Sequence, residues 1–281
     1  MANISNPRPD FIGKGWLLPP QGFEYEKPPP EEILRLADPK DEWLRLVKSF
    51  ERLKNGYFDE DVSLFQLVSS SQDSDIWYAG LRILGHAASR DCRWAMRVLF
   101  RHPVEDTRMA AYDAALYSAD LRLIEPLLVA CRNSQREERI TIMSRLSHML
   151  EYEPGDLYDD MGELSQEEYE ERVVSASRAC EKRYGADVAI FEGSPLSLAR
   201  IAGRVETLCE SSEAYEYSGT ISMYFDLIEA MTGHSTAGVF DSEITVDPHA
   251  AIRVVAELQR SGALERFQPG KRYFFGHPLP A

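Results

Sequence analysis

The sequence predicts a mainly α-helical protein whose central part is a short α-solenoid. Two patterns support this prediction: a repeat of 31 residues between Asp61 and Leu150, and apolar side chains at helical spacing on both sides of that repeat. The chain is also acidic: 46 acidic and 31 basic side chains give a formal net charge of -15, which bears on the partner and not on the fold. A chain of 281 residues can bury a core that needs no disulfide or metal to stabilise it.

Residues 1–30 predict an extended N-terminal arm. They hold seven of the sixteen prolines, which remove backbone donors and disfavour a helix. The arm is also rich in large apolar side chains, so we expect it to lie along the body and bury them. These side chains are Phe11, Trp16, Leu17, Leu18, Phe23 and Tyr25. From Glu31 the apolar residues follow a helical period, which ends at Asn55 and Gly56.

The 31-residue repeat reads three times as a helix, a short polar turn and a second helix. Positions that align, first in the first helices and then in the second, are Phe65, Met96 and Leu127; Val68, Leu99 and Ala130; Tyr78, Met109 and Ile140; Leu81, Tyr112 and Met143; and Leu84, Ala115 and Leu146. An acidic residue begins each second helix, at Asp75, Asp106 and Glu137, where it suits the helix dipole. Because one repeat cannot bury its apolar face alone, three stacked repeats predict a short α-solenoid.

Residues 61–150 resemble the compact HEAT-like helical repeats of many bacterial proteins. The resemblance lies in the pattern of apolar and small residues and covers about a third of the chain. It implies that the Phe65 set and the Leu84 set face one continuous core.

An acidic segment follows the repeat. Between Glu151 and Glu171 there are ten acidic residues and no basic one. Pro154 and Gly155 predict a loop, and Ser165 with Glu168 predicts a capping box that starts a new helix.

The remaining residues predict three more helices and a hairpin. One helix is expected to open at Ser194–Pro195, one to span roughly 222–231 and one to open at Asp247–Pro248. Residues 263–276 read as a hairpin with its turn at 268–271.

These changes in pattern divide the chain into three parts. Residues 1–30 form the extended arm, and 31–150 form the helical-repeat body. Residues 151–281 form the acidic segment and a mainly helical region that ends in a hairpin. We expect the last part to be a small mixed cap, because the terminal repeats of an array must cover an apolar face.

No motif predicts catalysis, a cofactor or a metal, so we expect a protein that is not an enzyme. The four cysteines lie tens of residues apart, and the six histidines show no metal-ligand spacing. Residues 233–238 resemble a nucleophile elbow around Ser235 but have one residue too many before Gly238. A hydrolase that uses Ser235 and His234 is kept as a hypothesis from another class.

The charge indicates the class of partner. A net charge of -15 argues against nucleic acid or an anionic membrane as the main ligand and favours a basic protein. Tyrosines interleave with the acids, and this combination can bind a basic surface, although a merely solubilising loop would look similar. The residues we predict to bind the partner are Asp156, Tyr158, Asp159, Asp160, Glu163, Glu213, Tyr215 and Glu216.

An acidic helical-repeat body of this kind resembles the immunity proteins that bacteria make against secreted toxin effectors. The resemblance implies stoichiometric neutralisation of a basic toxin domain, for instance a nuclease. The alternative is an adaptor or scaffold whose repeats hold another protein or a peptide. With no apolar run near the N-terminus, we expect the protein to be in the cytoplasm.

Overall fold

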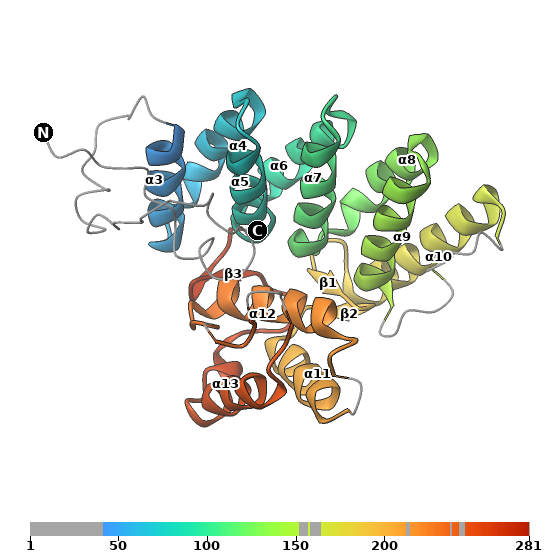
Figure 1. The fold of residues 1–281 in the computed structure, drawn as a ribbon. Coiled ribbons are helices and arrows are strands. Elements are labelled where there is room, and N and C mark those ends of the chain that lie inside the picture. The colour runs from blue at the N-terminus through green and yellow to red at the C-terminus, as the bar shows by residue number, and fades with distance from the viewer. Residues whose placement is uncertain are drawn as a thin grey trace, which may run out of the picture. The chain divides into compact units, whose positions relative to one another are not determined.

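The computed structural model describes residues 42–151, 157, 164–211, 214–236, 238–241 and 245–280. The predicted mainly α-helical fold is confirmed (Figure 1). The α-helices in this part of the chain are α3 (Glu42–Lys54), α4 (Asp61–Ser70), α5 (Ser74–Ala87), α6 (Arg90–Met96), α7 (Glu105–Ser118), α8 (Ile124–Asn133), α9 (Arg136–Leu150), α10 (Gln166–Tyr184), α11 (Leu198–Glu210), α12 (Ser218–Thr232) and α13 (Pro248–Arg260). Short 3-10 helices are η1 (Phe58–Glu60), η2 (Arg97–Arg101), η3 (Leu121–Leu123) and η4 (Leu264–Arg266). The strands are β1 (Ile190–Phe191), β2 (Ser194–Pro195), β3 (Tyr273–Phe274) and β4 (His277–Pro278).

None of the described helices is long and apolar enough to cross a membrane. The predicted arm over residues 1–30 lies outside the described residues.

The chain divides into two compact units, and each is made of separate stretches of sequence. Among the described residues, the first unit takes in those up to Tyr57 together with Ser197–Pro269 and Tyr273–Pro278. The second unit takes in Phe58–Leu196 and Gly270–Arg272, with the last residues of the chain.

The second unit contains the predicted repeat as three helix pairs: α4 with α5, α6 and η2 with α7, and α8 with α9. The helices α5, α7 and α9 pack against one another in chain order, and α10 packs against α8 and α9 (Figure 1). We call α5, α7 and α9 the second-helix row, and α4, α6 with η2, and α8 the first-helix row.

Burial follows the alignment of the repeats. Leu84, Ala115 and Leu146 are fully buried, as predicted, and so are Met96 and Leu127. Phe65, which aligns with Met96 and Leu127, is only half-buried.

A close contact between backbones holds α5 against α7. A Cβ atom on Gly85 would lie 2.8 Å from the Cα atom of Ala114, so the two helices approach closely only because residue 85 has no side chain. The absence of a side chain at residue 85 therefore sets the distance between α5 and α7 at this point.

Polar side chains join successive repeats at about the repeat spacing. Arg108 on α7 donates from Nε and Nη2 to Glu138 on α9, at 2.7 and 3.0 Å, and the Tyr112 hydroxyl donates to the same carboxylate at 2.7 Å. Arg145 on α9 donates to Asp113 on α7 at 2.6 Å. These bonds fix the register between neighbouring second helices.

A segment after the repeats closes the carboxyl ends of α7 and α9. Ile190 donates its backbone N–H to the Ala119 carbonyl at 2.9 Å, and Glu192 donates to the His148 carbonyl at 2.9 Å. Gly270 pairs with this segment through Ala189 and Leu196, at 2.9 and 2.8 Å. We call residues 189–196 and 270–272 the brace.

Two sequence predictions near the brace need correction. Ser194 and Pro195 do not open a helix, because they form β2, in which Pro195 pairs with Ile190. The helix begins at Leu198, where the Ser197 hydroxyl accepts the Arg200 N–H at 3.4 Å. The predicted capping box of Ser165 and Glu168 is confirmed at the start of α10.

The first unit contains α3, α11, α12 and α13 and the hairpin of β3 and β4. In this unit α11 packs against α12 and α13, and α12 packs against β3. Phe50 on α3 makes edge contacts with Phe274 and Phe275, with ring centroids 6.2 and 5.7 Å apart. Asp247 caps α13, as predicted, by accepting from the N–H groups of His249 and Ala250.

The terminal hairpin is present, but its turn is not where the sequence predicted it. Tyr273 pairs with Pro278, so the turn consists of Phe275 and Gly276, both with positive φ (48 and 84°). Positive φ at both positions matches the twist of a two-residue hairpin. The prediction of a turn at 268–271 is wrong, because the residues before it form the 3-10 helix η4 and not a strand.

Candidate interaction surface

Most of the residues predicted to bind a partner lie outside the described part of the chain. Asp156, Tyr158, Asp159, Asp160, Glu163 and Glu213 lie outside the described residues. Tyr215 and Glu216 are described, and both are exposed in the turn between α11 and α12, with 63% of Tyr215 accessible. A tyrosine so exposed is available as an aromatic contact.

Three acids of the acidic segment have partners within the chain. The Glu151 carboxylate accepts from the Ser147 hydroxyl at 2.8 Å and from the backbone N–H of buried Leu157 at 3.2 Å. Glu168 forms the capping box, and Glu170 forms an ion pair with Arg132 on α8. These three carboxylates therefore stabilise the fold around α10.

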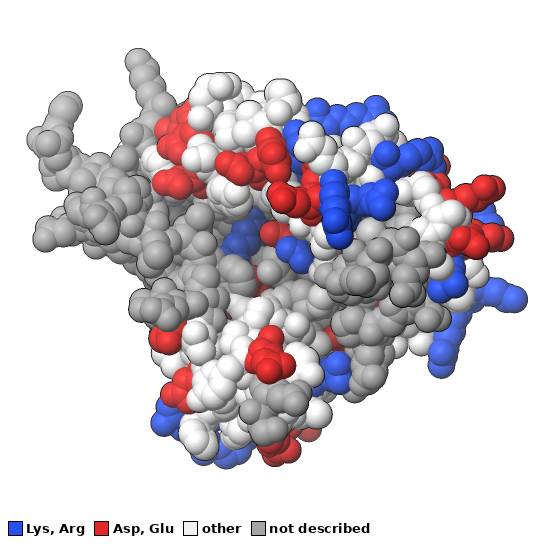
Figure 2. Space-filling model, turned by 45° about the vertical axis from the view of Figure 1, so that its right-hand side comes forward, with Lys and Arg blue, Asp and Glu red and all other residues white. Residues whose placement is uncertain are grey.

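A second acidic surface lies at the amino ends of the second-helix row. We call it the acidic edge, and its residues are Asp73, Asp75, Glu105, Asp106 and Glu137. Asp75 is half-exposed and the other four are exposed. Neighbouring helices lie roughly 8–10 Å apart, so the edge repeats its charge at about that spacing. Figure 2 shows one face of the molecule, on which acidic and basic side chains lie next to one another.

Half-buried apolar side chains lie next to the acidic edge. Tyr78, Met109 and Ile140 occupy equivalent positions on α5, α7 and α9, three residues after the acids at 75, 106 and 137. Burial raises the pKa of Tyr78, and the charges of Asp106 and Asp113 raise it further. The pattern is present in the sequence, because the acids and the apolar residues both recur every 31 positions. From the sequence alone, these acids were explained only by their favourable interaction with the helix dipole, and an exposed surface was not predicted.

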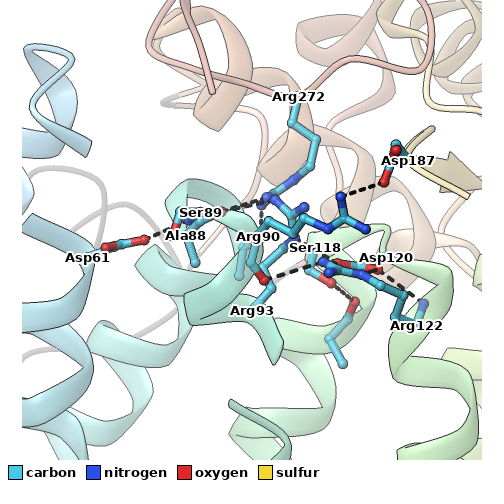
Figure 3. Close-up of polar contacts among 12 residues, drawn as sticks. Asp61, Ala88, Ser89, Arg90, Arg93, Ser118, Asp120, Arg122, Asp187 and Arg272 are labelled. Carbon is cyan, nitrogen blue, oxygen red and sulfur yellow. Dashed lines mark hydrogen bonds and ion pairs between the residues drawn. The ribbon is translucent and has the colours of Figure 1, made fainter. Parts of the chain in front are cut away.

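The carboxyl end of α5 carries a different arrangement, a cluster of arginines around one carboxylate (Figure 3). Arg272, from the brace, is buried and donates to the carbonyls of Ala88, Gly85 and His86 at 2.8, 2.6 and 2.9 Å. Arg93 donates to Asp120 at 2.9 Å, and Arg122 donates to the same carboxylate at 2.9 Å.

Electrostatics show why this cluster is stable. Burial alone raises the pKa of Asp120, but hydrogen bonds from Arg122 and the charge and hydrogen bond of Arg93 lower it to about 2. Burial lowers the pKa of Arg272 well below its usual range, and the charge of Arg93 acts in the same direction. At neutral pH the Asp120 carboxylate is therefore ionised and balances part of the positive charge. The guanidinium of Arg272 supplies donors to the carbonyls that end α5, which is a structural role.

The surroundings of the cysteines do not favour nucleophilic thiol chemistry. All four cysteines are free and buried. Burial raises the pKa of the Cys92 thiol to about 12 and those of Cys131 and Cys209 to about 11. At neutral pH these groups are protonated and are poor nucleophiles.

The arrangement around Ser235 lacks the geometry of a nucleophile elbow. Such an elbow places the serine between a strand and a helix, whereas His234 and Ser235 directly follow helix α12, which ends at Thr232 with Gly233 as its C-cap. The Nε2 atom of His234 lies 3.8 Å from the Oε2 atom of Glu257. In the part of the chain that the structure describes, no group of His, Cys, Asp and Glu could hold a metal ion.

No protein family model, no curated protein and no solved structure matches the chain.

Proposed function

We propose that this protein binds another protein through a short HEAT-like α-solenoid and neutralises it stoichiometrically. The partner would be basic, such as a toxin effector domain with nuclease activity, and the protein would act as an immunity protein in the cytoplasm. The observation that carries the proposal is the acidic edge, which has carboxylates at the same positions of three successive helices, half-exposed at Asp75 and exposed at Asp106 and Glu137.

The physical argument is one of electrostatic complementarity. A formal net charge of -15 attracts a basic protein and repels nucleic acid. A nuclease must present a basic surface to its substrate, so an acidic protein that covers this surface excludes DNA or RNA. Half-buried Tyr78, Met109 and Ile140 would then supply apolar contact beside the charges. Exposed Tyr215 and Glu216 extend the same chemistry in the first unit.

The class of function is tested by expressing the product of a neighbouring gene in a bacterial host. An immunity function predicts that one such product arrests growth and that co-expression of this protein restores it. Purified together, the two should form a complex of fixed stoichiometry that abolishes the toxin's activity. A toxic neighbour that stays fully active in the presence of this protein would exclude it as the target, and the absence of any toxic neighbour would count against immunity.

The surface is tested by charge reversal with that partner. Asp106→Lys combined with Glu137→Lys should lower the association rate constant about tenfold and flatten its dependence on salt. Glu181→Lys combined with Glu265→Lys, which reverses exposed acids on α10 and η4, is the matched control and should leave the rate close to that of the unmodified protein. Equal rates for all variants would remove the acidic edge from the interface.

The predicted loop residues are tested in the same assay. Reversal of Asp159 and Asp160 to lysine should slow association, whereas Tyr158→Ala should raise the dissociation rate if the ring is a buried anchor. Unchanged kinetics for these variants would exclude the acidic segment as a binding site.

The second candidate function is an adaptor that holds another protein or a peptide on its repeats. Exposed apolar side chains on the first-helix row favour it, since 41% of Trp94 and 56% of Val98 are accessible. An adaptor predicts no toxic neighbour and a partner that remains active when bound.

A further inference from the structure

The first-helix row carries a surface whose chemistry is opposite to that of the acidic edge. Trp94 on α6 and Val98 on η2 are one helical turn apart, and both are among the most exposed large apolar side chains of the described residues. A tryptophan and a valine exposed together on one helix face are typical of an interaction site.

The repeat continues this apolar surface onto α8. Val129 on α8 aligns with Val98 at the repeat spacing and is half-exposed. Because η2 packs against α8, the two valines lie on adjacent elements of the same row. Val174 on α10 extends the apolar surface further, because it lines a groove together with Val129.

The groove between α8 and α10 has a volume of about 460 Å³. Its floor is apolar and includes Leu121, Ile124 and Leu128, which are buried. A groove with an apolar floor between two helices fits the apolar face of another helix.

Arginines border this surface. Arg97 stacks on the Trp94 ring, with its Cζ atom 4.0 Å from the ring centroid, and donates to the Trp94 carbonyl at 2.6 Å. Arg101 is exposed one turn further along, and Arg132 aligns with it at the repeat spacing on α8. Arg178 on α10 is exposed and lines the groove.

The charge of the surface determines what it can bind. The groove is lined by three arginines, Arg122, Arg132 and Arg178, and by two glutamates, Glu125 and Glu170, and Arg122 is paired with Asp120. Arg97 and Arg101 lie on the neighbouring η2, so basic side chains outnumber acidic ones on this surface of a protein with a formal net charge of -15. Glu170 is already paired with Arg132. Arg97, Arg101 and Arg178 offer charge-assisted hydrogen bonds to carboxylates of a partner.

We propose that this surface, which consists of Trp94, Val98, Val129 and Val174 with their bordering arginines, binds an acidic amphipathic helix of another protein. The apolar face of that helix enters the groove between α8 and α10, and its Asp and Glu side chains pair with Arg97, Arg101 and Arg178. Nucleic acid fits less well, because its charged backbone has no apolar face to fill a groove lined by Leu121, Ile124 and Leu128. The proposal does not depend on neutralisation of a basic partner, which uses the acidic edge.

The test uses a fluorescently labelled synthetic helical peptide with leucines on one face and glutamates on the other. The matched peptide has lysines in place of the glutamates. Fluorescence anisotropy with the full-length protein should show binding of the glutamate peptide and at least tenfold weaker binding of the lysine peptide. Failure of the glutamate peptide to bind at millimolar protein would overturn the proposal.

Variants locate the binding site. Arg101→Glu combined with Arg178→Glu should raise the Kd for the glutamate peptide at least tenfold, and Trp94→Ala should raise it several-fold. These side chains are exposed or partly exposed, so the substitutions are not expected to unfold the protein, which circular dichroism would confirm. Arg253→Glu combined with Arg260→Glu on α13 is the control, because it makes the same charge change at exposed sites of the first unit. Equal affinities for all variants would place the peptide elsewhere and refute the proposal.

Two further measurements exclude other occupants. A duplex DNA that displaced the peptide at equal concentration would identify the surface as a nucleic-acid site. A doubling of the mass in light scattering that Arg101→Glu reversed would identify it as a contact between two copies of this chain. Either result would overturn the proposal. Asp106→Lys with Glu137→Lys should leave peptide binding unchanged, which separates this surface from the acidic edge.

Discussion

Replacing Arg272 by methionine is expected to destabilise the second unit by about 3 kcal/mol. The guanidinium donates three hydrogen bonds to carbonyls at the end of α5, on Ala88, Gly85 and His86. The Ala88 carbonyl also accepts from Arg93 at 3.1 Å and keeps that bond, so the main loss falls on two carbonyls. A buried acceptor left unsatisfied costs about 1–3 kcal/mol, which gives roughly 2–6 kcal/mol for the two. Methionine offsets part of this cost, because it removes a charge whose burial is unfavourable.

The assay is urea denaturation of the full-length protein, followed by far-ultraviolet circular dichroism. The free energy of unfolding of Arg272→Lys should lie between those of the unmodified protein and of Arg272→Met. A lysine keeps the charge but cannot reproduce the planar set of donors of the guanidinium. Arg266→Met, at an exposed position on η4, is the control and should change stability by less than about 0.5 kcal/mol. A change below about 1 kcal/mol for Arg272→Met would show that the carbonyls find other donors and that the brace does not stabilise α5.

Three further substitutions test packing and charge in the second unit by the same assay. Leu99→Ala should cost about 2–5 kcal/mol, because Leu99 is buried, and a loss below about 0.5 kcal/mol would contradict its place in the core. Gly85→Ala should cost about 1–3 kcal/mol, because its Cβ atom would lie 2.8 Å from Ala114, and an unchanged stability would show that α5 can move away from α7. Asp120→Asn should cost about 2 kcal/mol at pH 7, because the carboxylate has a pKa of about 2 in the fold against 3.8 ordinarily. A lowered pKa stabilises the fold above the ordinary value, so the difference between Asp120 and asparagine should shrink as pH falls from about 4 towards 2, and a constant difference would contradict the ionic role.

Local and periodic features of the fold could be predicted from the sequence. The period of 31 residues predicted the positions of α4 to α9, because burial repeats whenever successive helix pairs stack. The capping box at Ser165 and the cap at Asp247 were also correct, since both depend on residues within one turn of the helix start.

Features that depend on distant contacts could not be predicted. Arg272 lies in a segment that reads as a strand, and nothing near it indicates that its guanidinium ends a helix almost 190 residues earlier. Pro195 follows a serine and reads as a helix start, yet its place is decided by pairing with Ile190. The hairpin turn was misplaced because Gln268–Lys271 contains the usual turn residues, whereas the real turn includes Phe275, whose positive φ has no signal in the sequence.

For the candidate surfaces, the sequence predicted the sign of the charge but could not place the residues in space. It identified the acidic segment, yet Glu151, Glu168 and Glu170 have partners within the fold. It explained Asp106 and Glu137 by the helix dipole, a local argument that says nothing of their exposure. The exposure of Trp94 and Val98 cannot be derived from the apolar pattern of the sequence, and only the structure shows it.

The two ends of the second-helix row differ in what they can offer to a partner. At the carboxyl ends, the backbone of the brace and the guanidinium of Arg272 already satisfy the carbonyls of α5, α7 and α9. A partner that bound there would have to displace buried hydrogen bonds, at a cost of about 1–3 kcal/mol for each group left unsatisfied. At the amino ends, the exposed carboxylates of Asp106 and Glu137 are hydrated, and pairing them with a cation of a partner displaces only water. We therefore expect substitutions in the brace to change the stability of the second unit, and substitutions in the acidic edge to change association rates while leaving stability nearly constant.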